Sequence, residues 1–124
     1  MLKINIIDDP YYLTEMAAIG KYGSMEIVVW TNDKEKIPHF HIRDHHKKED
    51  NEGCIRIDKA EYFDHSGKTM RLNASQKKDL IQFLNETDED LGITYWKYLV
   101  NAWNRNNSDV KISNNTPMPN YTDL

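Results

Sequence analysis

The stretch Ile37-Pro38-His39-Phe40-His41-Ile42-Arg43 decides the fold that this sequence predicts. Pro38 cannot donate a ladder hydrogen bond, so it belongs at the start or the edge of a strand. The residues after it alternate strictly. Because successive side chains of a strand point to opposite faces, Phe40 and Ile42 face one way, and the two histidines and Arg43 face the other. The stretch therefore predicts a strand with a core side and a polar side.

Other strand-like segments surround this one. Residues 24–31 are rich in β-branched and aromatic side chains, and both faces are apolar from Ile27 onward, which is typical of a central strand. Residues 54–58 alternate, with the isoleucines facing the core. Residues 69–72 predict a short strand. Residues 2–7 predict another, at an edge of the sheet.

Three segments predict helices. Asp9 and Pro10 are typical of a helix start, so we expect a short helix over residues 10–19. The capping-box pattern Asn73-Ala74-Ser75-Gln76 begins a second helix. Thr94 begins a third, whose apolar stripe ends at Trp103. Residues 85–94 hold four acids and a glycine and indicate a loop, with a single kinked helix as the alternative.

Strands followed by two helices predict an α+β fold rather than alternating β and α units. We expect a small, mostly antiparallel sheet of about four strands, two C-terminal helices packed on one face and the short N-terminal helix. A chain of 124 residues is one domain in size, here residues 1–105. Residues 106–124 form a polar tail, disordered unless apolar side chains dock it. The docking candidates are Val110, Ile112, Met118 and Tyr121.

Composition narrows the function classes. The formal net charge of −4 disfavours a general nucleic-acid binder, which carries a basic patch. Cys54 is the single cysteine, so neither an intramolecular disulfide nor a multi-thiolate zinc site can form. No apolar run approaches the length of a membrane span and no secretion signal is visible. We expect a cytoplasmic protein without membrane contact, and no cofactor, since no glycine-rich phosphate loop is present.

The polar side of the predicted sheet is the candidate binding surface. His39, His41 and Arg43 lie on one strand, and Arg56 and Asp58 lie on the next. Neighbouring side chains across strands sit about 5 Å apart. Two imidazoles and two guanidiniums would favour phosphate or carboxylate. Trp30 is the candidate platform beside them, whereas residues 44–53 read as a solvated loop.

Three interpretations of the two histidines compete. In the first, His39 and His41 hydrogen-bond neighbouring loops and have a structural role only. In the second, they ligate one metal ion, because residues two apart on a strand can share an ion, with Asp33, Glu35 or His45 as a third ligand. In the third, they are catalytic acids or bases, since histidine titrates near neutral pH. We expect no metal and keep the set His39, His41 and Asp33 as the alternative.

The order of these pieces resembles a known family. Tyr22-Gly23, a strand, a polar turn and then Pro38-His39-Phe40-His41-Ile42 are similar to the bacterial domain-of-unknown-function family with a P-H-x-H-V signature. Later pieces that match are Ile55-Arg56-Ile57-Asp58, the capping box, and Ala102-Trp103-Asn104. The resemblance covers residues 22–104. The sequence departs from the family pattern in a longer N-terminal segment, an acidic insertion over residues 86–93 and the C-terminal tail. It also has Ile37 where the family often has a proline.

The resemblance implies a small cytoplasmic protein, often encoded beside a second small protein in arrangements like toxin–antitoxin modules. No established reaction comes with that family. The leading hypothesis is therefore a non-enzymatic interaction module with a protein partner, in a toxin–antitoxin-like or defence-related pair. The alternative is a histidine- or metal-dependent enzyme acting on a phosphate-bearing substrate, RNA or a nucleotide. A nucleic-acid-binding regulator ranks third, and a homo-oligomer stays compatible with the sequence.

Overall fold

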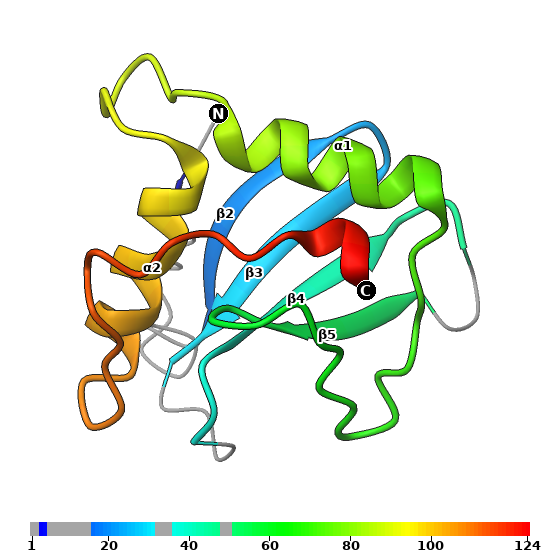
Figure 1. Cartoon of the computed structure of the whole chain (residues 1–124), viewed down its shortest axis with the longest axis horizontal. Coiled ribbons are helices and arrows are strands. Elements are labelled where there is room, and N and C mark those ends of the chain that lie inside the picture. Colours follow the sequence, from blue (N-terminus) through cyan, green and yellow to red (C-terminus); the bar gives the residue numbers. More distant parts are fainter. Residues whose placement is uncertain (1–2, 5–15, 32–35, 48–50) are drawn as a thin grey trace.

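A five-stranded antiparallel sheet and two helices build the protein (Figure 1). The computed structural model describes residues 3–4, 16–31, 36–47 and 51–124. The strands pair in chain order: β1 (Lys3–Ile4), β2 (Met16–Tyr22), β3 (Met25–Trp30), β4 (His39–Asp44) and β5 (Glu52–Arg56). The helices are α1 (Ala74–Asn85), α2 (Tyr95–Asn106) and a 3-10 turn, η1 (Tyr121–Asp123). The predicted α+β class is confirmed.

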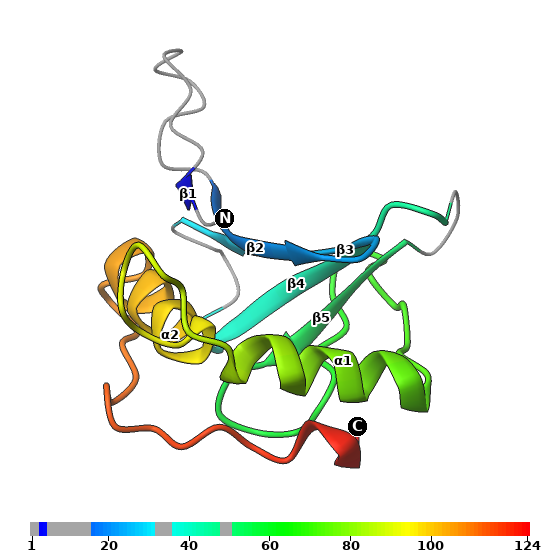
Figure 2. The ribbon, with the colours of Figure 1, turned by 90° about the horizontal axis from the view of Figure 1, so that it is seen from above.

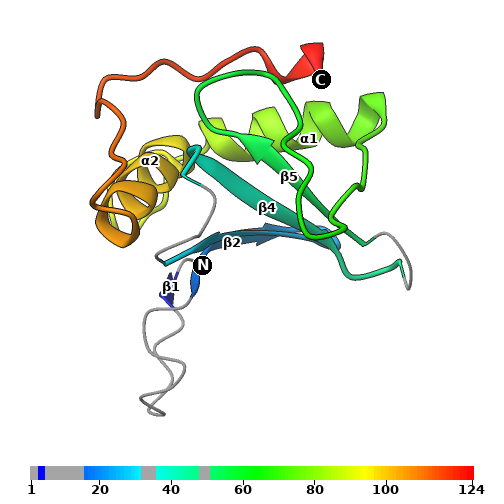
Figure 3. The ribbon, with the colours of Figure 1, turned by 90° about the horizontal axis from the view of Figure 1, so that it is seen from below.

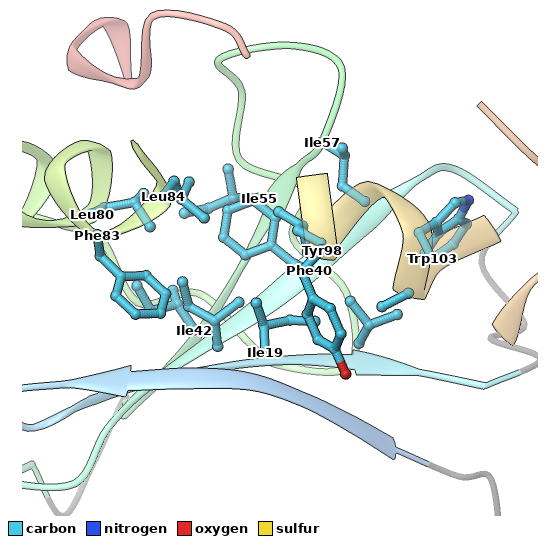
Figure 4. Packing of buried hydrophobic residues seen from close by; sticks show 14 of the residues in the cluster. Ile19, Phe40, Ile42, Ile55, Ile57, Leu80, Phe83, Leu84, Tyr98 and Trp103 are labelled. Carbon is cyan, nitrogen blue, oxygen red and sulfur yellow. The ribbon is translucent and has the colours of Figure 1, made fainter. Parts of the chain in front are cut away.

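Both long helices lie on one side of the sheet (Figure 2). Phe40 and Ile42 of β4 and Ile55 of β5 are fully buried in the core between the sheet and the helices. Leu80 of α1 and Trp103 of α2 meet them from the helix side (Figure 4). The alternation read from the sequence at β4 is therefore confirmed: Phe40 and Ile42 carry the core and His41 lies on the opposite side, while the ring of His39, at the start of the strand, lies 5.5 Å from that of Trp103.

The two helices begin where their capping residues predict. The Asn73 side chain accepts from the Gln76 N–H, and the Gln76 side chain accepts from the Asn73 N–H, which completes the capping box. The Thr94 hydroxyl accepts from the Lys97 N–H at the start of α2. Residues 86–94 separate the helices, so the alternative of one kinked helix is wrong.

The N-terminal prediction needs correction. Residues 16–19, expected at the end of a helix, belong to β2, which pairs with β3 through a register shift between Ala18 and Gly20. Residues 10–15 of the predicted helix lie outside the described residues. Of the predicted edge strand over 2–7, Lys3–Ile4 forms β1, and residues 2 and 5–7 are not described.

The predicted solvated loop over residues 44–53 is wrong at both ends. Asp44 closes β4, and β5 begins at Glu52, two residues earlier than expected. Gly53 sits where a Cβ would lie 2.5 Å from the Met70 carbonyl oxygen, so the close backbone approach requires glycine there. The predicted strand over 69–72 is reduced to a single bridge between Gly53 and Thr69.

The C-terminal tail is docked on the body of the protein (Figure 1, red). Tyr121, one of the four docking candidates, is fully buried. Its hydroxyl lies 3.0 Å from the Arg56 carbonyl oxygen and 2.9 Å from that of Ile57, at the end of β5. The tail is thereby hydrogen-bonded to the C-terminal end of β5. None of the described helices has both the length and the apolar character needed to cross a membrane.

Candidate functional site

Three histidines meet on the polar side of β4, where the His39 ring also lies 5.1 Å from that of Phe63 and 5.5 Å from that of Trp103. His39 and His41 come from β4, and His65 comes from the connection between β5 and α1. Their ring centroids lie 5.2 Å (His39 to His41), 4.9 Å (His39 to His65) and 5.3 Å (His41 to His65) apart. One ring nitrogen of each lies within 4.8 Å of the other two. We call these three residues the histidine cluster.

The connection that supplies His65 follows the outer edge of β5 (Figure 3, green). Backbone hydrogen bonds hold it there, from Phe63 N to Cys54 O (2.8 Å) and from Met70 N to Glu52 O (3.0 Å). His65 and Lys68 bracket a tight turn, with Lys68 N donating to His65 O. Ser66 and Gly67 both have positive φ, as in a type I′ hairpin turn. Such a turn pairs His65 and Lys68, so both side chains reach the same face.

Hydrogen bonds fix the imidazole rings of both strand histidines. His39, only 1% exposed, has Nδ1 2.6 Å from the Ile37 carbonyl oxygen. His41 has Nδ1 2.6 Å from Oε2 of the buried Glu52. Since a carbonyl can only accept and the ionised Glu52 carboxylate only accepts, both Nδ1 atoms carry the proton and donate. In the neutral imidazole the Nε2 atom of each ring then presents a lone pair.

Glu52 is the charged centre of the site. Arg43 Nε lies 3.4 Å and Lys68 Nζ 3.5 Å from its Oε1 atom. Burial by itself raises the pKa of this carboxyl, but the hydrogen bond from His41 and the charges of Arg43 and Lys68 lower the pKa to about 2. Glu52 is therefore ionised at neutral pH and orients His41.

A pocket of about 330 Å³ opens beside the cluster. It is small for a ligand site, and its volume suits a small molecule or a single nucleotide unit. Arg43 stands over one wall, its guanidinium carbon 5.7 Å from the Trp30 ring centroid. The pocket, called the histidine pocket below, is lined by Trp30, Thr31, His41, Arg43, Glu52, His65, Ser66 and Lys68.

The other candidates from the sequence lie around this centre. Arg56 pairs with His39 in the β4–β5 register, but its guanidinium binds Asp58, with Nε to Oδ1 at 3.2 Å, and neither residue lines the histidine pocket. Cys54 Sγ lies 3.4 Å from His41 Nδ1. His45, a candidate third ligand, instead contacts Glu26 at 3.2 Å. Asp33 and Glu35, the other candidates for that position, are outside the described residues.

Three functional residues escaped the sequence reasoning: Glu52, His65 and Lys68. Glu52 was assigned to a solvated loop, and its polar neighbours gave no sign that β5 reaches it. The polar run over residues 64–68 predicts a turn, and Ser66 and Gly67 form one, but nothing local indicates that this turn brings His65 against β4. A signal did exist in Ser66-Gly67, which suits a two-residue hairpin that brings His65 and Lys68 together.

Comparison with known proteins gives no relative: no protein-family model, no curated protein and no solved structure matches the chain. The resemblance to the P-H-x-H-V family therefore stays a prediction.

Proposed function

We propose that this protein acts on a small phosphate-bearing substrate held in the histidine pocket. The observation that carries the proposal is the convergence of His41, His65, Arg43 and Lys68 on one concave site. Phosphate groups are recognised by guanidinium and ammonium donors. A strand carrying His41 and Arg43 two residues apart delivers a reactive group and an anion-binding group to the same place.

The reactive groups that border the pocket are imidazole nitrogens. Imidazole serves phosphoryl chemistry in two ways, by proton transfer near neutral pH and by metal coordination. The carboxylate of Glu52 favours both, because it fixes the tautomer and the orientation of His41. A merely structural histidine pair would not require a third histidine and a pocket beside it.

The charge balance indicates what the histidines must add. Arg43 and Lys68 bring two positive charges, and the buried carboxylates of Glu26 and Glu52 offset them. An anionic substrate therefore needs further positive charge beside the pocket, which a cation held by the histidine cluster would supply.

The substrate class follows from the wall and the size of the pocket. The Trp30 ring offers a surface on which a nucleobase can stack. The net charge of −4 disfavours tracking along a nucleic-acid backbone. A nucleotide, or a single-stranded RNA end that enters the pocket by one unit, fits both constraints. We expect a cytoplasmic location.

The interaction module stays a prediction, and the residues that the structure describes give it little exposed apolar surface. The buried core of a partner interface is enriched in apolar and aromatic side chains. Among the residues that the structure describes, Leu91, at 49% exposure, is the large hydrophobic side chain that is exposed. It lies in the loop between α1 and α2.

The test measures binding and turnover with defined probes. Inorganic phosphate, adenosine monophosphate and a dinucleotide are titrated against the full chain, with and without added zinc, and hydrolysis of bis(4-nitrophenyl) phosphate is followed. Arg43→Ala should weaken binding at least about tenfold, and His41→Gln should abolish hydrolysis. Arg105→Ala, an exposed arginine on α2, is the matched control and should change neither. Failure of wild type to bind any probe under either condition overturns the proposal.

A further inference from the structure

The ring nitrogens of the histidine cluster converge on one point. His39 Nε2 and His65 Nε2 lie 3.2 Å apart, and a nitrogen of His41 lies within 4.8 Å of both. A tetrahedral zinc ion with Zn–N distances of about 2.0–2.1 Å separates two ligand nitrogens by about 3.3 Å. The His39–His65 spacing already matches that separation.

The outer contacts of the rings are those of metal ligands. A metal-bound histidine usually donates its second ring N–H to a carboxylate or a backbone carbonyl, which fixes the tautomer. His41 Nδ1 makes the first kind of contact, to Glu52, and His39 Nδ1 makes the second, to the Ile37 carbonyl. Both rings thus direct Nε2, the atom with the lone pair, away from these anchors.

Protonation of the three histidines explains their arrangement less well than a bound metal ion does. Three imidazolium charges within 4.8 Å of one another, two of them on buried side chains, would repel strongly. A neutral His65 could donate to His39, but that single bond does not require His41 to approach the same point. A cation that accepts all three lone pairs satisfies the whole cluster.

We propose that His39, His41 and His65 bind one transition-metal ion, zinc by preference. Imidazole nitrogens favour zinc over magnesium and calcium, which prefer oxygen ligands. Three protein ligands leave a fourth position, as in catalytic zinc sites. That position faces the histidine pocket, because two of the three ligands, His41 and His65, line it.

A bound metal ion also supplies the positive charge that the pocket lacks. Two added positive charges turn a site that is nearly neutral into one that attracts anions. A zinc ion there polarises a phosphoryl oxygen or lowers the pKa of a bound water. This role rests on the proposed function, whereas the binding of the metal does not.

The test titrates the full-length chain, without a polyhistidine tag, with Zn²⁺ after chelator treatment. Calorimetry should find one zinc per chain, and Co²⁺ should give the intense visible bands of a tetrahedral nitrogen site. Zinc should also raise the melting temperature, because it binds only the folded state. His65→Ala, on a surface turn, should weaken zinc binding at least about 100-fold and remove the thermal shift. His39→Gln is the second variant, with the same expected loss.

His46→Ala, an exposed histidine that lies outside the cluster, is the control and should bind zinc like wild type. Wild type that takes up no stoichiometric zinc overturns the inference, as does binding that His65→Ala leaves unchanged. Zinc binding without affinity for any phosphate probe overturns the proposed function alone. Phosphate binding by a chain that takes up no zinc overturns this inference alone.

Discussion

His41 and Glu52 face each other diagonally across β4 and β5, with Nδ1 of the imidazole 2.6 Å from Oε2 of the carboxylate. Both side chains are buried, at 5% and 9% exposure. The hydrogen bond from His41 and the ion pairs with Arg43 and Lys68 offset the cost of burying this carboxylate. The same hydrogen bond orients the His41 ring within the histidine cluster.

Replacing Glu52 should therefore weaken metal binding without removing a ligand. Glu52→Gln keeps the shape of the side chain but loses the charge that fixes the His41 tautomer, and we expect zinc affinity to fall about 10–100-fold. Isothermal titration measures the change.

Glu26→Gln is the matched control for that experiment. Glu26 is a similarly buried carboxylate on the same sheet face, paired with Arg43 and His45 and not with the cluster. Its loss should leave zinc affinity within about threefold, well short of the effect of an orienting partner. Equal losses in the two variants would mean that Glu52 acts through general charge rather than through His41.

The docked tail should contribute to stability through one hydroxyl. Tyr121→Phe removes the donor that contacts the carbonyl oxygens of Arg56 and Ile57 and should lower the free energy of unfolding by about 1–2 kcal/mol. Urea denaturation measures this. Thr122→Ala, exposed beside it and hydrogen-bonded to Asn120, should stay within about 0.5 kcal/mol of wild type. A Tyr121→Phe variant as stable as wild type would mean that the tail is not held at β5.

Asp88, in the loop between α1 and α2, should make the stability of the fold depend on pH in the acid range. Burial raises the pKa of this carboxyl, but the backbone N–H of Leu91, the Tyr95 hydroxyl and the N–H of Asp90 together hold the pKa below its usual value of 3.8. Because the folded-state pKa is lowered, the stabilisation is present above about pH 3.8 and is lost as pH falls through the folded-state pKa.

Asp88→Ala should consequently lower the melting temperature at pH 7, and the difference from wild type should shrink below about pH 4. Thermal denaturation over a pH series measures it. Asp90→Ala, exposed in the same loop, should melt within about 1 °C of wild type at pH 7. A deficit for Asp88→Ala that is constant down to pH 2 would show that its carboxylate charge is not what matters.

Local patterns predicted the parts of the fold that depend on local chemistry. The alternation around Phe40 and Ile42 defines the two faces of β4, and the side-chain caps at Asn73 and Thr94 define where the helices begin. These signals are local, so the sequence carries them in full. The segment at Met16 carries a competing signal, because its alanines and methionine favour a helix, and only pairing with β3 makes it a strand.

The sequence predicted only the part of the candidate site that lies on a single strand, β4. His39, His41 and Arg43 share a face because of their spacing. His65 joins them from 24 residues further along the chain than His41, through a turn whose docking depends on tertiary contacts. Glu52 was hidden in a polar run that resembles a loop, since a buried ion pair leaves no hydrophobic pattern.

The most direct test of the metal site is X-ray absorption spectroscopy of the zinc-loaded chain. The predicted spectrum has nitrogen neighbours at about 2.0–2.1 Å with the outer-shell scattering of three imidazoles, reduced to two in His65→Ala. A sulfur shell at about 2.3 Å, or a first shell of oxygen without imidazole scattering, would contradict the assignment of zinc to His39, His41 and His65.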